Sequence, residues 1–217
     1  IQRAVVSIAS TPYWSAIGFR VVALIGIALI ARYVPKLAET HGIDPAAAFW
    51  LSVLNPLVLL HFSLGGHNDA LMVGLILAGL HFATQRRHVG SALALAAAVA
   101  VKPIALVAVP FAALLFLPTA ATFARRCTAY VVATGTVLAL VVASGAAMGV
   151  GVGWAHALTT PGSVRTWLSP TTGLGMAIGL IGDLFGNRNV DALAVTSIRT
   201  LGMLAAIAMC SWLLLRP

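Results

Sequence analysis

Leu64-Gly65-Gly66-His67-Asn68-Asp69 is the stretch around which this 217-residue sequence is organised. It joins two apolar runs, Ala46–Phe62 and Ala70–Ala83, and places an imidazole, an amide and a carboxylate in three consecutive residues. Both runs are shorter than the roughly 20 apolar residues that cross a bilayer as a helix, so we expect the two glycines to lie at a hairpin tip below the membrane surface. Irregular backbone at that depth is tolerated only where it lines protein or a wet cavity. The sequence therefore predicts a recessed polar pocket at this turn.

The composition indicates a membrane protein. Hydrophobic residues make up 60% of the chain and charged residues only 8%, whereas about a quarter of the residues of a soluble domain are charged. The apolar runs do not alternate as barrel strands do, so helices must satisfy the backbone in lipid. We predict an all-α polytopic membrane protein with about seven or eight transmembrane or partly spanning helices, in one domain over residues 1–217. The first residue, Ile1, and the end directly after an apolar run lead us to expect part of a longer chain.

The net charge of +8 does not predict nucleic-acid binding. The sequence has no basic stripe with interleaved aromatic residues, and its basic residues lie at the ends of apolar runs, where they act as topology signals. We therefore expect membrane lipids and no nucleic acid as partners. P-loop, HExxH and CxxC motifs are absent from the sequence, so we predict no metal ligands, while a divalent metal cofactor stays open. The basic residues concerned are Arg32, Lys36, Arg86, Arg87, Arg125 and Arg126.

The remaining apolar runs complete the predicted set of helices. Ile17–Val34 is the first, and the segment from Arg32 to Lys36 is expected to end it. Val89–Leu117 is too long for one ordinary span and has Lys102-Pro103 in its middle, so we expect two short legs with the lysine at the apex. The later spans are Cys127–Met148, Thr172–Phe185 and Ala192–Leu215.

Two further prolines predict local breaks. Asp44 is expected to cap a helix that has Pro45 at its first position. Asn55-Pro56 should interrupt the run Ala46–Phe62, since proline removes a backbone hydrogen bond. Asn55 either satisfies the freed carbonyl groups or lines the site, and the sequence leaves both readings open.

Basic residues favour the cytoplasmic side of a membrane. The clusters Arg32/Lys36 and Arg86/Arg87 are separated by two helices, so they agree with each other and place Gly65–Asp69 outside. The hairpin with Lys102 at its apex returns Arg125 and Arg126 to the inside. The same counting places the long connection Gly149–Thr172 outside. The predicted active face is therefore extracytoplasmic.

Six residues on that face form the candidate site. His67 and Asp69 are the candidate catalytic groups, because either accepts a proton from an attacking hydroxyl. Lys102 is a compact cation for a phosphate, and Arg165 suits phosphate oxygens. Asn68 and Trp167 would bind substrate, the tryptophan by stacking on a sugar. The set fits a lipid phosphate leaving group and a polyhydroxy acceptor, with Asn68, Lys102, Arg165 and Trp167 as the substrate-binding residues.

Structural explanations for these residues stay open at this point. Lys102 is also a candidate for a snorkelling topological charge, and Asn68-Asp69 for the start of the third helix. Trp167 also fits an interfacial aromatic belt. We expect Arg199, about two turns into the last helix, to pair with Asp183 or Asp191.

Several motifs resemble those of a known family. They are Leu54-Asn55-Pro56-Leu57-Val58-Leu59-Leu60-His61-Phe62, Gly65-Gly66-His67-Asn68-Asp69-Ala70-Leu71-Met72 with Gly74-Leu75, Val101-Lys102-Pro103 with Pro110-Phe111, and the segment from Pro161 to Thr171. They are similar to those of the actinobacterial polyprenol-phosphate-mannose-dependent α-(1→6)-mannosyltransferases. The resemblance spans about residues 20 to 185, and its most specific part is the His-Asn-Asp block.

The resemblance implies a C-type glycosyltransferase fold and a hexosyltransferase that inverts the anomeric centre by direct displacement. The implied donor is polyprenyl-phosphate mannose, and the implied acceptor is a growing α-(1→6)-mannan of lipomannan or lipoarabinomannan at the plasma membrane. The presumed catalytic acid of this family lies in the first extracytoplasmic loop, and no matching acidic loop precedes Ile17. The resemblance therefore implies that the catalytic base lies upstream of Ile1 and that this segment is inactive alone.

Two other functions compete with this interpretation. Broken helices with polar groups near the midplane also occur in transporters and flippases for polar or lipid-linked solutes. A transporter of that kind should carry an inverted repeat, and we find none in the sequence. A non-catalytic membrane scaffold is disfavoured because the polar residues gather on one predicted face.

Overall fold

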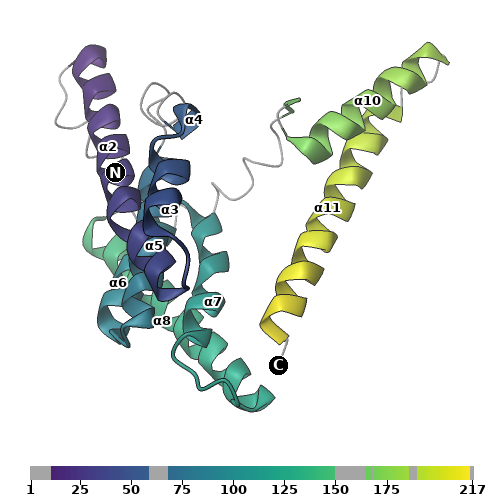
Figure 1. Cartoon of the computed structure of the whole chain (residues 1–217). Helices are drawn as coiled ribbons and strands as arrows, with labels where there is room; N and C mark the ends of the chain where they lie inside the picture. Colours follow the sequence, from purple (N-terminus) through teal and green to yellow (C-terminus); the bar gives the residue numbers. More distant parts are fainter. Residues whose placement is uncertain (1–10, 59–67, 150–164, 168, 186–189, 216–217) are drawn as a thin grey trace. The chain divides into compact units, whose positions relative to one another are not determined.

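The computed structural model describes residues 11–58, 68–149, 165–167, 169–185 and 190–215 (Figure 1). Every regular element in these ranges is a helix, which confirms the all-α class. Three of the helices, α2, α8 and α11, are long and apolar enough to cross a membrane. The elements are α2 (Pro12–Thr40), α3 (Pro45–Val53), α4 (Pro56–Val58), α5 (Asp69–Thr84), α6 (His88–Val101), the 3-10 helix η2 (Pro103–Val107), α7 (Ala108–Leu114), α8 (Phe123–Ala147), α10 (Pro170–Leu184) and α11 (Val190–Leu215).

The chain divides into two compact units, Ile1–Val152 and Gly153–Pro217, which are described separately below. The first holds α2 to α8, and the second holds α10 and α11. The expectation of a single domain over residues 1–217 stays a prediction. The long apolar helices make the chain a membrane protein.

Helix α2 is longer than the predicted span Ile17–Val34. The expectation that Arg32 to Lys36 ends it is wrong, because Pro35 lies inside the helix. Proline removes one backbone hydrogen bond, but contacts on either side of it hold the helix together. Tyr33 packs its ring 5.3 Å from that of His81 on α5, and Ala38 is buried. Tertiary packing therefore overrides the local preference to stop at the proline.

The two other predicted breaks near the start of the chain are confirmed. Asp44 caps α3 by accepting a hydrogen bond from the Ala46 N–H at 3.0 Å, with Pro45 at the first helical position. Helix α3 ends at Val53, before Asn55-Pro56, and α4 begins at the proline. The run Ala46–Phe62 is therefore interrupted within its described part.

Helix α2 packs closely against α5, and α3 lies beside α2 (Figure 1). A Cβ atom on Gly26 of α2 would collide with the backbone of Ala70 and Leu71 on α5, and Ala70 is fully buried. Small residues allow helix backbones to approach in this way. The contact fixes the first turn of α5 against α2, next to Asp69.

Helices α5 and α6 form a hairpin whose turn contains Gln85, Arg86 and Arg87. Arg86 adopts a left-handed conformation with φ of 59°. Helix α6 ends at Val101, η2 and α7 follow the Lys102-Pro103 break, and α8 packs on both α6 and α7. The residues after α7 come back beside the start of α6, because the rings of His88 and Phe116 stack with their centroids 4.1 Å apart. The predicted hairpin with Lys102 at its apex is confirmed.

In the second unit, α10 packs against the first half of α11. Glycines on α10 make this possible. A Cβ atom on Gly175 would lie 2.5 Å from the Cα of Val195, and one on Gly179 would lie 2.5 Å from a carboxylate oxygen of Asp191. Glycines four residues apart lie on the same helix face, so this face of α10 is fitted to α11.

Candidate functional site

Lys102 owes its position to the proline that follows it. The residue before a proline is driven towards extended backbone, and Lys102 has φ of −147° and ψ of 124°. Its N–H closes α6 by donating to the carbonyl of Ala98 at 3.0 Å, and its own carbonyl accepts from the Ala105 N–H at 3.0 Å. Lys102 is thus fixed through its backbone at the junction between two helices.

Asp69 is the first residue of α5, and Asn68 is the N-cap. The Asn68 carbonyl accepts a hydrogen bond from the Met72 N–H at 3.1 Å, but no side-chain hydrogen bond caps the helix. The prediction that Asn68-Asp69 starts the third helix is confirmed. A carboxylate in the first turn is favoured by the helix dipole, so Asp69 is stable in this place before any partner is considered.

The α5–α6 hairpin brings these two residues together. Helix α5 begins where α6 ends, and Lys102 Nζ donates to Asp69 Oδ1 at 2.6 Å. The side chains remain 39% and 30% exposed, respectively. A pair this accessible contributes about 0.2–1 kcal/mol to stability. The contact therefore orients the ammonium group more than it stabilises the fold, and it leaves Lys102 within reach of a ligand.

The pair combines two groups with different chemical uses. The ammonium group of Lys102 is a positive point charge for a phosphate. The carboxylate of Asp69 accepts hydrogen bonds from Lys102 or from a hydroxyl group. The sequence placed both residues on one face, and the structure places them in contact. Their predicted roles with substrate stay predictions.

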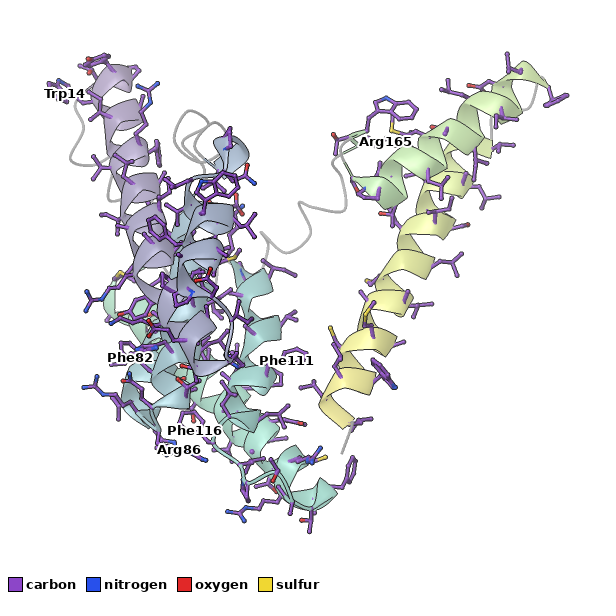
Figure 2. The ribbon with its side chains drawn as sticks, viewed as in Figure 1. Trp14, Phe82, Arg86, Phe111, Phe116 and Arg165 are labelled. Atoms are coloured by element: carbon purple, nitrogen blue, oxygen red, sulfur yellow. The ribbon has the colours of Figure 1, made fainter. Side chains whose placement is uncertain are left out.

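Arg165 and Trp167 belong to the second unit and are described with it. Arg165 forms an ion pair with Asp191 at the start of α11 (Figure 2 labels Arg165). Trp167 is 56% exposed, and its carbonyl oxygen lies 3.0 Å from where a Cβ of Gly173 would be. Arg165 thus ties the segment before α10 to α11. Binding of phosphate by Arg165 and of sugar by Trp167 stays a prediction.

The Arg165–Asp191 pair was not predicted from the sequence. Arg199 was expected to pair with Asp183 or Asp191, and its Nε donates to Thr172 Oγ1 at 2.9 Å. Thr172 is buried, and its hydroxyl also donates to Ser169 Oγ at 3.1 Å. No spacing rule links residues on either side of α10. The GxxxG pattern of Gly175 and Gly179 is the sequence feature that indicates close packing of α10 against another helix.

His67 and the Gly65-Gly66 tip lie outside the described residues, so the recessed pocket and the catalytic role of His67 stay predictions. Among the residues that the structure describes, no group of three or more His, Cys, Asp or Glu side chains is arranged to hold a metal.

Comparison with known proteins decides the family. A family described as "Alpha-(1->6)-mannopyranosyltransferase, N-terminal domain" matches residues 1–118. The chain belongs to this family. The match includes both Asp69 and Lys102, and it confirms the resemblance that the sequence motifs indicated. No solved structure matches the chain.

Individual members of the α-(1→6)-mannopyranosyltransferase family are similar over most of this chain. One from Mycobacterium tuberculosis is 30% identical and aligns with 90% of this chain and 42% of its own length. A probable member from Mycolicibacterium smegmatis is 32% identical over 90% of this chain and 40% of its own. Alpha-(1->6)-mannopyranosyltransferase A of M. tuberculosis is 36% identical over 75% and 33%, respectively. The chain thus spans less than half the length of these relatives.

Proposed function

We propose that this chain is part of a membrane hexosyltransferase that moves mannose from a polyprenyl-phosphate carrier to a growing α-(1→6)-mannan of lipomannan or lipoarabinomannan. The observation that carries the proposal is the Asp69–Lys102 pair, which lies within the residues matched by the mannopyranosyltransferase family. The relatives are named for mannosyl transfer. The pair supplies a cation for the phosphate that such a donor would release.

The proposed reaction is a displacement at the anomeric carbon. A hydroxyl oxygen of the acceptor forms a bond to C1 of mannose, the bond from C1 to the phosphate oxygen breaks, and polyprenyl phosphate leaves with the bonding electrons. Lys102 stabilises the negative charge that develops on the departing phosphate. The hydroxyl proton passes to a base, for which His67 is the candidate among the residues of this sequence.

Asp69 acts in this scheme as a positioning residue. Its carboxylate contacts Lys102 Nζ at 2.6 Å and holds the ammonium group at the end of the hairpin. An arriving phosphate offers oxygen atoms that share the ammonium group with Asp69. Since an ammonium group has three donors, Lys102 can contact both at once.

The active face is proposed to be extracytoplasmic in a multi-pass protein of the plasma membrane. Two features support this assignment. Lys102 and Asp69 lie at one end of the α5–α6 hairpin, and Arg86 and Arg87 lie in the turn at its other end. Because basic residues favour the cytoplasmic side, the ion pair belongs to the opposite side.

The test uses membranes from cells that express the protein with its whole natural chain and lack their own enzyme. Labelled polyprenyl-phosphate mannose and a short α-(1→6)-mannoside are added, and the extended mannoside is measured. Lys102→Met keeps the apolar stem and removes the charge, and we expect a fall in kcat of about 10²- to 10³-fold, as for loss of one transition-state donor. Lys102→Arg should recover part of the rate.

Lys36→Met is the matched control, because it removes a lysine from the opposite end of the same unit. It should leave the rate unchanged. A wild-type protein that transports the labelled lipid without forming a glycosidic product would overturn the proposed function. A Lys102→Met variant as active as wild type would remove Lys102 from the mechanism and leave the transferase assignment intact.

A further inference from the structure

The first unit also has an apolar groove, which extends toward the end opposite the Asp69–Lys102 pair. Helices α6, α7 and α8 enclose a groove of about 260 Å³. Its floor is closed by Val109 and Val137, which are 1% and 2% exposed, and its rim includes Val132, which is 60% exposed. Most of the lining is alanine, valine and leucine, so the groove is narrow and apolar. A helix with its side chains is about 10 Å across, so a groove of this volume suits a thinner, linear chain.

A cationic residue, Arg125, lies on α8 near the residues that line the groove. Ala129, Val132 and Thr136 line it, and Arg125 precedes Ala129 by four residues. Residues with spacings of three or four lie on one helix face, so Arg125 lies on the same face of α8 as these lining residues, one turn before them. It is exposed. Arg125 takes part in neither of the two ion pairs described above, Lys102–Asp69 and Arg165–Asp191.

The same end of the groove carries a second arginine, Arg86, and the imidazole ring of His88. His88, the first residue of α6, lines the groove and stacks on Phe116 at its end. Arg86 donates from its Nη1 to the Phe116 carbonyl at 2.5 Å, and Figure 2 shows the two labelled residues close together. No acidic residue occurs in the sequence between positions 70 and 182, so the three helices supply no carboxylate. The positive charge at this mouth is therefore available to an anion from outside.

We propose that this groove binds one acyl chain of an anionic glycerophospholipid, with the lipid phosphate at Arg125 and the neighbouring Arg86 and His88. The apolar groove matches the chain, and the basic mouth matches the head group. Basic pockets between transmembrane helices bind anionic head groups in this way. The site is separate from the proposed transfer site, because His88 and Lys102 lie at opposite ends of α6, about 20 Å apart at 1.5 Å per residue.

The test is photocrosslinking of the purified, full-length protein in lipid nanodiscs. The probe is phosphatidylglycerol with a diazirine in one acyl chain, and labelled peptides are mapped by mass spectrometry. We expect labelling on α6, α7 and α8. Arg125→Gln should reduce it about fivefold, the equivalent of about 1 kcal/mol for one basic residue at an anionic surface. Arg20→Gln, which removes an exposed arginine from α2, is the matched control and should leave labelling unchanged.

A second pair of variants tests the groove itself. Ala133→Trp fills the groove, whereas Val131→Trp places the same ring on an exposed face of α8, since Val131 is 73% exposed. Only the first should remove the label. Equal competition by phosphatidylcholine with the same acyl chains, or stronger competition by polyprenyl phosphate, would overturn the proposal. Labelling confined to other helices, or labelling that survives both Arg125→Gln and Ala133→Trp, would also overturn it.

Discussion

The two ends of the α5–α6 hairpin hold their charges in different ways. At one end, the carboxylate of Asp69 meets the ammonium group of Lys102 at 2.6 Å. At the other end, Arg86 has a main-chain carbonyl, that of Phe116, as its hydrogen-bond partner. The first end is balanced between an acid and a base, whereas the second is held by an uncharged acceptor and remains positive.

This difference separates two kinds of function. In the proposed transfer reaction, the balanced pair orients a cation for a ligand that binds and leaves, because Asp69 pairs with Lys102 again after the phosphate departs. An unbalanced cluster attracts anions that stay, such as the phosphates of an anionic leaflet. The first arrangement suits turnover, and the second suits a permanent lipid contact.

Exchanging Asp69 and Lys102 should have the largest effect on mannosyl transfer. The double variant Asp69→Lys with Lys102→Asp retains an ion pair but moves the positive charge to the start of α5. We expect mannosyl transfer to fall by about 10²- to 10³-fold, with a small change in the thermal midpoint because an exposed pair contributes little to stability. Transfer by the mannoside assay and unfolding by differential scanning are both measured. Activity near wild type in the exchanged variant would show that the pair is structural only.

Gly26→Val should have the next largest effect, because it displaces the first turn of α5. The new side chain would meet the backbone of Ala70 and Leu71, and overpacking of this kind costs about 1–3 kcal/mol. The thermal midpoint and the transfer rate should therefore fall together. Gly135→Val on α8 is the control, since a Cβ there has open space. Equal losses from both substitutions would mean that helix propensity, and not this contact, explains the effect.

The helix breaks and the candidate residues could be predicted from sequence for a local reason. Proline acts on its own backbone and on the residue before it, so Asp44-Pro45, Asn55-Pro56 and Lys102-Pro103 carry their consequences in place. Pro35 is the exception, because contacts between α2 and α5 keep the helix continuous.

The two ion pairs also differ in whether local sequence features could predict them. Helices α5 and α6 are joined by a short turn, and a hairpin of this kind brings the start of α5 beside the end of α6. That geometry follows from helix length and turn position. The sequence alone therefore places Asp69 and Lys102 at the same end of the hairpin. The Arg165–Asp191 contact crosses α10 and depends on tertiary packing, and no local pattern of charges signals it.

Replacing Arg86 should lower the free energy of unfolding by a smaller amount and should leave the Asp69–Lys102 end of the hairpin unaffected. Arg86→Gln loses a charged donor to the Phe116 carbonyl. Hydrogen bonds to charged groups contribute about 1.5–3 kcal/mol, and exposure of this side chain reduces the expected loss to about 1 kcal/mol. Unfolding in detergent without anionic lipid measures it, with Arg20→Gln as the control. A larger loss for Arg20→Gln would contradict a stabilising role for this hydrogen bond between the α5–α6 turn and the residue after α7.

Arg165→Gln should have the smallest effect on stability, below about 1 kcal/mol, because both members of its ion pair are partly exposed. Hydrogen exchange should rise in the segment before α10 and in the first turn of α11, where Asp191 lies, and stay unchanged around Asp69. Asp191→Asn is the matched variant, since it breaks the same pair from the other side. If both variants raise exchange but only Arg165→Gln lowers mannosyl transfer, the arginine binds phosphate in addition to its structural contact, as its sequence position suggested. If both leave transfer unchanged, Arg165 is a tether within the second unit and takes no part in transfer.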